Sequence, residues 1–84
     1  MATTNIRARA IDTIAAHLGR SPDEIQEDKR VIEDLDADSL DIVELTMAIE
    51  EEFNMEVLDS EVQRVKTVGD VLKIIYNKQG TAGL

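Results

Sequence analysis

The sequence contains no cysteine, and its aromatic residues are only Phe53 and Tyr76. Without cysteine, the chain has no disulfide to stabilise its core and no thiolate to bind a metal or act as a nucleophile. With so few aromatics, the core has to be aliphatic, and the stacking platforms that bind single-stranded nucleic acid are missing. The 84 residues suit one small helical domain.

Long apolar runs are also missing. No stretch approaches the roughly 20 apolar residues of a membrane-spanning helix. The first ten residues, MATTNIRARA, lack the apolar centre of a secretory signal. We therefore expect a cytoplasmic protein with no membrane span.

Basic residues are absent from a long central stretch of the chain. Between Glu33 and Glu61 there are 12 acidic residues and no lysine or arginine, and the net charge of the whole chain is −9. Such a surface repels the phosphate backbone of nucleic acids. It attracts basic protein surfaces and accelerates their encounter. The simpler alternative is that the acids only keep a small helical protein in solution.

The spacing of apolar residues predicts an all-α fold, a small bundle of three main helices plus one short helix, with a long first loop. The main helices are expected over residues 4–18, 39–53 and about 67–77, and the short one over 59–65. Residues that cap or end helices support these boundaries. They are Thr3 or Thr4 and Gly19 for the first helix, Asp38, Asp41 and Asn54 for the second, Asp59 or Ser60 for the third, and Thr67 for the fourth.

The connection over residues 19–37 is long for a small domain, and ordered loops of this length often serve function. Ser21 and Pro22 are placed to open one short helical turn. The apolar residues of the loop must still be buried somewhere, so we expect the loop to be attached to the core. These residues are Ile25, Val31, Ile32 and Leu35.

The second helix has two apolar stripes. The first, Ile42, Leu45, Ile49 and Phe53, is sufficient for the core of a small bundle. The second is interleaved with acids and has the pattern of a docking strip, in which apolar anchors give affinity and charges give register. The alternative is that these residues cover the loop, or are exposed without consequence. The second stripe is Leu40, Val43 and Met47, and its acids are Asp41, Glu44, Glu50 and Glu51.

Ser39, at the start of this helix, allows several readings. A nucleophilic serine needs a nearby base, and the only histidine is His17 on another helix. A calcium loop is suggested by three alternating aspartates (Asp34, Asp36, Asp38), but Ser39 stands in place of its glycine and Leu45 in place of its final glutamate. We therefore expect neither catalysis nor a specific metal site.

A third reading follows from the helix start itself. Free backbone N–H groups and the positive end of the helix dipole favour a phosphate there. Ser39 is thus well placed to carry a group linked through a phosphodiester. The alternative is that serine is simply favourable in a first helical turn.

The segment EDLDADSLDIVELTMAIEEEF, residues 33–53, resembles the core of acyl carrier proteins. Within it, Asp38-Ser39-Leu40 resembles the DSL attachment motif of that family. The likeness extends from about Ile6 to Tyr76, and TVGDVLKII resembles the family's last helix. Two residues depart from the family pattern. Asp36 stands where glycine is usual, although aspartate tolerates positive φ better than most residues, and Leu58 stands where proline is common.

The resemblance implies a carrier and not an enzyme. Its cofactor would be a covalent 4′-phosphopantetheine on Ser39, transferred from coenzyme A by a phosphopantetheinyl transferase, with a thiol that holds acyl chains as thioesters. Family members shelter the acyl chain in the bundle interior and present the helix after the serine to basic patches on fatty acid synthesis enzymes. The recognition surface carried over by position is Asp38, Leu40, Asp41, Val43, Glu44, Met47, Glu50 and Glu51.

We therefore expect a monomeric acyl carrier of fatty acid synthesis, forming one domain over residues 1–84 that is ordered over about 4–78, with a frayed tail at 79–84. A specialised carrier of polyketide, peptide or lipid A acyl groups is the nearest alternative. An unmodified acidic helical adaptor and a calcium-binding helical protein are alternatives from other classes.

Overall fold

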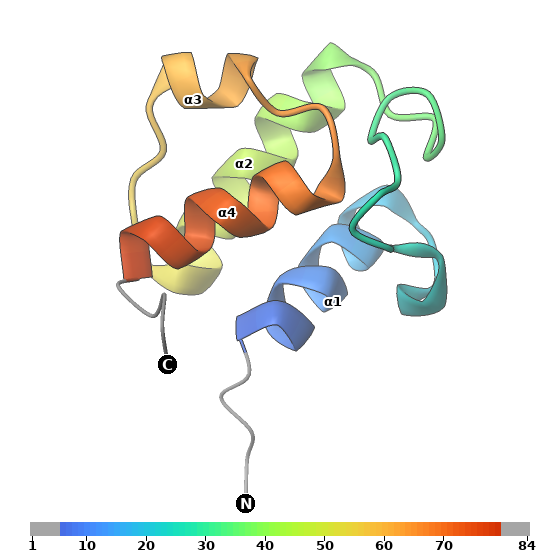
Figure 1. Cartoon of the computed structure of the whole chain (residues 1–84), viewed down its shortest axis with the longest axis horizontal. Coiled ribbons are helices and arrows are strands. Elements are labelled where there is room, and N and C mark those ends of the chain that lie inside the picture. Colours follow the sequence, from blue (N-terminus) through green and yellow to red (C-terminus); the bar gives the residue numbers. More distant parts are fainter. Residues whose placement is uncertain (1–5, 80–84) are drawn as a thin grey trace, which may run out of the picture.

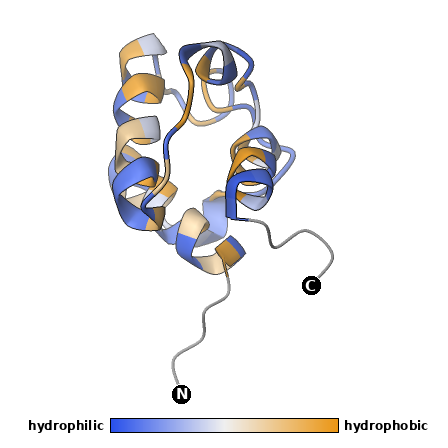
Figure 2. Cartoon of the chain, turned by 90° about the vertical axis from the view of Figure 1, so that its left-hand side faces the viewer, coloured by the Kyte–Doolittle hydropathy of each residue, from blue (hydrophilic) through white to orange (hydrophobic). Residues whose placement is uncertain are grey.

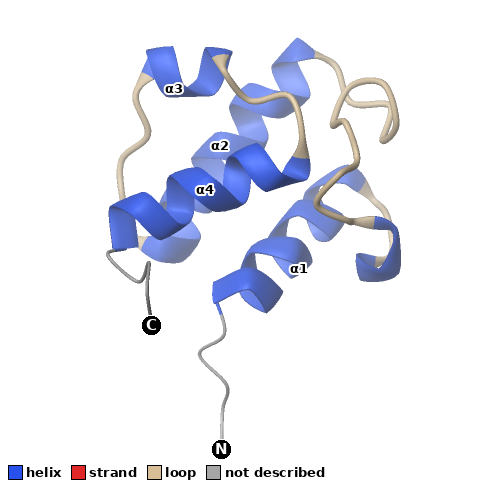
Figure 3. Ribbon diagram, viewed as in Figure 1, coloured by secondary structure: helices blue, strands red, loops and turns tan. Residues whose placement is uncertain are grey.

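The computed structural model describes residues 6–79. The helices, in chain order, are α1 (Ile6–Leu18), the single 3-10 turn η1 (Pro22–Glu24), α2 (Ser39–Phe53), α3 (Asp59–Gln63) and α4 (Val68–Gln79). The three long helices surround one core, and the short α3 lies on the connection from α2 to α4 (Figure 1). Among the described residues there are helices and loops but no strand (Figure 3). The expected fold class is confirmed.

The ends of α2 follow the predicted capping. Asp38 is the N-cap, and its Oδ1 accepts the N–H of Asp41 at 2.9 Å, while Asp41 Oδ2 accepts the N–H of Asp38 at 3.0 Å. This reciprocal pair is a capping box, which fixes the first turn. Gly19 and Asn54 end α1 and α2 in left-handed conformations, with φ of 67° and 53°.

The structure corrects the boundaries of the two later helices. Leu58, and not Asp59 or Ser60, holds the cap position of α3, because the Glu61 carboxylate accepts the Leu58 N–H at 2.9 Å. α3 ends at Gln63, before the predicted residue 65, and α4 continues to Gln79. Gln79 Nε2 donates to the carbonyl of Phe53 at 3.0 Å, which anchors the longer helix to α2. The expected caps at residues 3 and 4, the start of the first helix at residue 4 and the tail over 80–84 lie outside the described residues.

The long first loop is attached to the core, as predicted, through three of its four apolar residues. Ile25, Val31 and Leu35 are buried, but Ile32 is 46% exposed, so its predicted burial is wrong. The reason lies in the backbone: Val31 N donates to the carbonyl of Lys66 at 2.9 Å and fixes the loop beside the start of α4. With Val31 directed into the core, its neighbour Ile32 remains at the surface.

The inner faces of the helices supply the rest of the core. Hydrophobic and hydrophilic residues alternate along the long helices (Figure 2), as expected for helices with one buried face. The predicted stripe of α4 is buried throughout, and no helix within residues 6–79 is long and apolar enough to cross a membrane. This stripe consists of Val68, Val71, Leu72 and Ile75.

Candidate functional site

Ser39 is the first residue of α2, and it is exposed. Within residues 6–79 its hydroxyl has no hydrogen-bond partner, and the neighbouring Asp38 carboxylate accepts the N–H of Asp41. The local sequence thus fixes the helix start through its cap and leaves the serine oxygen accessible. Free N–H groups of the first turn lie beside it and favour a phosphate at this position.

A groove of about 750 Å³ opens beside Ser39. It is formed by the first loop, the start of α2, and the segment that contains α3 and leads to α4. Its wall is largely apolar, and Arg30 and Lys66 are its two cations. Its apolar side chains include the exposed Ile32. The remaining lining residues are Glu33, Ile42, Val43, Val62, Gln63, Val65 and Thr67.

The hydrolase reading of Ser39 is not supported by the position of His17. His17 lines a different hollow, between α1 and α2, together with Arg9 and Glu52. Its Nε2 lies 3.7 Å from Glu44 Oε1, a carboxylate of α2. Ser39 therefore has no histidine beside it among the described residues to act as the base that a nucleophilic hydroxyl requires.

The three aspartates of the calcium-loop reading are held by separate partners. Asp34 Oδ2 accepts the N–H of Arg30 at 2.9 Å, and Asp36 Oδ2 lies 3.0 Å from Arg20 Nη2. Asp38 is the cap of α2. In the part of the chain that the structure describes, no group of three or more His, Asp or Glu side chains could hold a metal ion.

The second apolar stripe of α2 lies at the surface. Leu40, Val43 and Met47 are 62%, 46% and 56% exposed, so they do not cover the first loop. Two of the acids beside them also have structural contacts. Asp41 belongs to the capping box, and Glu50 Oε2 accepts the N–H of the Val57 backbone at 2.7 Å. The stripe is therefore an exposed apolar surface within an acidic frame, part of which also stabilises the fold.

The other acids of the recognition surface have few partners. Among the described residues, Glu44 pairs only with His17, and Glu51 is exposed. Over residues 6–79, no lysine or arginine forms an ion pair with the carboxylates of Asp38, Asp41, Glu44, Glu50 or Glu51. Their negative potential is therefore available to a basic partner.

The core beneath this surface is closed. Between α2, α4 and the segment around α3 there is an apolar space of about 10 Å³, which is roughly the room for one water molecule. An acyl chain can enter this region only if the surrounding side chains move apart. The space is lined by Ile42, Leu45, Thr46, Ile49, Val57, Val65, Val71 and Ile74.

The chain is similar to a known family and to curated proteins over most of its length. Residues 8–75 match the family described as "Phosphopantetheine attachment site". The acyl carrier protein of Sulfurovum sp. (strain NBC37-1) is 48% identical over 66 residues, which cover 79% of this chain and 88% of that protein. This chain belongs to the acyl carrier protein family. The acyl carrier protein of Wolinella succinogenes is 47% identical over 64 residues, covering 76% of this chain and 84% of that protein.

Membership of the family confirms three expectations: the resemblance to acyl carrier proteins, the role of an acyl carrier, and the covalent 4′-phosphopantetheine cofactor. The residues at the start of α2 fit that cofactor. The exposed hydroxyl of Ser39 lies at a helix N-terminus and borders the apolar groove, whose two cations suit a phosphodiester.

One contact near the site, made by Arg20, was not predicted from the sequence. Asp36, which replaces the family's usual glycine, has a φ of 62°, and its side chain is held by Arg20. Arg20 is 16 positions away in the chain, so no periodicity or motif connects the two. The only indication was the demand for positive φ at position 36, which an aspartate meets less easily than a glycine.

Proposed function

We propose that Ser39 Oγ is the attachment point of the phosphopantetheine arm, and that the chain delivers fatty acyl groups to synthase enzymes without catalysing a reaction itself. The observation that carries this proposal is the exposed hydroxyl at the first residue of α2, which has no partner within residues 6–79 and lies inside the matched family region. In the attachment step, the serine oxygen bonds to the phosphorus that carries pantetheine in coenzyme A. The diphosphate bond breaks, adenosine 3′,5′-bisphosphate leaves, and the serine proton is released.

The residues of the chain would then position the arm. When bound, the cofactor supplies a thiol that holds acyl groups as thioesters, chemistry that a chain without cysteine lacks. Ile32, Val43 and Val62 give the groove an apolar wall along which the arm can lie. Arg30 and Lys66 offer charge to its phosphodiester. The tether raises the local concentration of the acyl group at each partner's active site.

The outer surface of α2 would recognise the partners, namely the transferase and the synthesis enzymes. Leu40, Val43 and Met47 supply apolar anchors, and the unpaired acids around them complement basic patches. Encounters governed by such charges are rapid and are weakened by salt. The full set that we assign to recognition remains Asp38, Leu40, Asp41, Val43, Glu44, Met47, Glu50 and Glu51.

Primary fatty acid synthesis is favoured over a specialised pathway. Both relatives are named simply as acyl carrier proteins, with no specialised product in their names. We infer a monomer in the cytoplasm, where the synthesis enzymes would be encountered. Analysis of the acyl groups on the purified protein would separate the two pathways.

Intact-protein mass spectrometry tests the attachment site. The protein is incubated with coenzyme A and a broad-specificity phosphopantetheinyl transferase, and we expect a mass gain of one phosphopantetheine. Ser39→Ala should show no gain. Ser60→Ala is the matched control, because Ser60 is also an exposed serine in the first turn of a helix, and it should gain the arm normally.

Two results would overturn the proposal. One is a wild-type protein that gains nothing from a transferase shown to be active on another carrier. The other is a gain that persists in Ser39→Ala, which would move the attachment to another residue.

A further inference from the structure

Arg20 directs its donors to three groups of the first loop. Its Nε donates to the carbonyl of Leu35 at 3.2 Å, and its Nη2 donates to Asp36 Oδ2 at 3.0 Å. On the other side, its Nη1 donates to Glu24 Oε1 at 3.0 Å. A planar guanidinium provides such a fork of donors in one fixed geometry, and a lysine ammonium does not.

The backbone of Arg20 is itself held firmly by the end of α1. Its N–H donates to the carbonyl of Ala15 at 2.9 Å, and the N–H of Gly19 donates to Ala16 at 3.4 Å. With Gly19 in the left-handed conformation, this pair of bonds is a Schellman motif. Arg20 therefore extends from a rigid helix end to the loop that precedes α2, and only 28% of its side chain is exposed.

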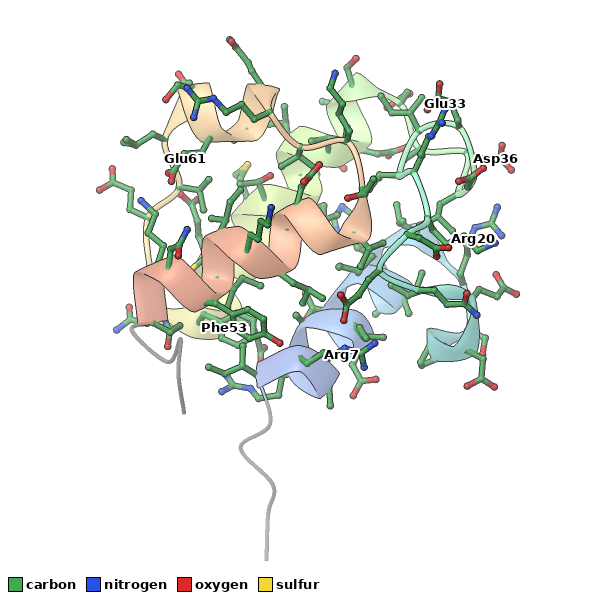
Figure 4. All side chains as sticks on the ribbon, in the orientation of Figure 1. Arg7, Arg20, Glu33, Asp36, Phe53 and Glu61 are labelled. Carbon is green, nitrogen blue, oxygen red and sulfur yellow. The ribbon has the colours of Figure 1, made fainter. Side chains whose placement is uncertain are left out.

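The loop at Asp36 needs such support. Its φ of 62° lies in the left-handed region, which is unfavourable for residues other than glycine, although less so for aspartate. The residues on both sides, Leu35 and Ala37, are buried at 4% and 5% exposure, so the backbone between them must turn sharply. Arg20 binds both the carbonyl before this turn and the carboxylate on it. Figure 4 shows Arg20 beside Asp36, with Arg7 at the opposite end of α1.

The turn at Asp36 leads directly to the candidate attachment site. Ala37 N donates to the carbonyl of Val31 at 3.1 Å, Asp38 follows in extended conformation as the cap, and Ser39 starts α2. A change in the backbone at Asp36 would therefore shift the cap and the serine hydroxyl. A displacement of this kind, far smaller than a change of fold, is sufficient to slow a reaction that depends on alignment.

We propose that Arg20 is a positioning residue for the modification of Ser39. By binding the Leu35 carbonyl and the Asp36 carboxylate, it keeps the left-handed turn that sets where the serine hydroxyl lies for the transferase. This inference rests on the proposed attachment at Ser39. It also assigns a role to the contact between Arg20 and Asp36, the aspartate that stands where the family usually has glycine.

The kinetics of the transferase test this role. We expect Arg20→Ala to lower kcat about fivefold, the size of coupling usual between neighbouring residues. KM should change little, because the recognition residues on α2 are untouched. Arg7→Ala is the matched control: it removes the same charge from α1, where Arg7 Nε contacts Glu27 Oε2 at 2.7 Å, and it should leave kcat unchanged.

A second substitution separates positioning from charge. Glycine adopts positive φ without cost, so Asp36→Gly should make Arg20 unnecessary, and the combined Arg20→Ala/Asp36→Gly variant should regain most of the lost kcat. Arg20→Lys keeps the positive charge and most of the aliphatic stem but not the fork of donors. Its kcat should therefore be nearly as low as that of Arg20→Ala. This variant also provides the test if Arg20→Ala fails to fold.

The outcomes are distinct from those for the proposed function. If the wild type accepts no arm at Ser39, the attachment proposal fails. If the wild type is modified and Arg20→Ala and Arg20→Lys have its kcat, the positioning role of Arg20 is overturned. It is also overturned if the loss in Arg20→Ala is equally large with glycine at position 36.

Discussion

The two faces of α2 use the same kinds of residue in opposite ways. On the inner face, Leu45 and Ile49 are 1% and 2% exposed; on the outer face, Leu40 and Met47 are 62% and 56% exposed. The inner face is sufficient for the core, so the fold gives no reason for apolar residues on the outer face. Exposed apolar side chains framed by unpaired acids are typical of a surface that binds a partner. The helix thus divides into a face that forms the core and an exposed face that we propose for recognition.

The acids of α2 show the same division. At the ends of the helix, Asp38, Asp41 and Glu50 accept backbone N–H groups and stabilise the fold. On the outer face, Glu44 and Glu51 have no lysine or arginine partner within residues 6–79. Substitutions on each face should therefore affect different measurements.

The largest expected effect is on the inner face. Leu45→Ala should lower the free energy of unfolding by about 2–5 kcal/mol, because it removes buried methyl groups and leaves a cavity. Met47→Ala, two residues further along α2 and on the outer face, should change it by less than about 0.5 kcal/mol. Urea unfolding followed by circular dichroism measures both. Equal losses in the two variants would show that the outer face is part of the core after all.

Met47→Ala should instead weaken the binding of a partner enzyme. We expect Met47→Ala to raise the KM of the transferase about tenfold, the consequence of losing one central apolar anchor. Leu58→Ala is the matched control, since Leu58 is 54% exposed but lies at the start of α3. A KM that rises equally in Leu58→Ala would indicate that exposed apolar area in general, and not the α2 surface, binds the transferase.

Much of this division could be predicted from the sequence. The period of 3.6 residues separates the two stripes of α2. Asp38 and Asn54 mark the two ends of α2, and Gly19 marks the end of α1. These signals can be predicted because they are local. The burial of Ile32 was predicted wrongly. An apolar residue in a loop gives no period, and its direction depends on a backbone pairing with residues far along the chain.

The contacts that support the site could not be predicted from the sequence for the same reason. Arg20 meets Asp36 only because the first loop folds back across the end of α1. Gly69 is a further example: on periodicity alone it is a mild defect of α4, yet a Cβ there would lie 3.2 Å from the carbonyl of Glu27. The first loop needs that close approach, because the N–H of Gly69 donates to the same carbonyl at 2.9 Å. Such requirements appear only once the segments are placed in space.

The smallest of the expected effects concerns a carboxylate that stabilises a helix start, Asp70. Its Oδ2 accepts the N–H groups of Lys66 and Thr67 at 2.9 and 3.0 Å. Burial raises the pKa of this carboxyl, but the hydrogen bonds from Thr67 and Lys66 outweigh burial, and the net pKa lies below its ordinary value. A carboxyl whose pKa is lower in the folded state stabilises the fold above its unfolded pKa, and this contribution is lost as the pH falls through the folded pKa.

Asp70→Asn should therefore reduce the free energy of unfolding by about 1 kcal/mol at neutral pH. The difference from the wild type should close in acid, below the ordinary aspartate pKa of about 4. Glu51→Gln is the outer-face counterpart, and at neutral pH it should stay within about 0.5 kcal/mol of the wild type. Urea unfolding at a series of pH values measures both. If Asp70→Asn differed from the wild type by the same amount at every pH, its contribution would not come from the ionised carboxylate, and the distinction between structural and free acids would not extend to α4.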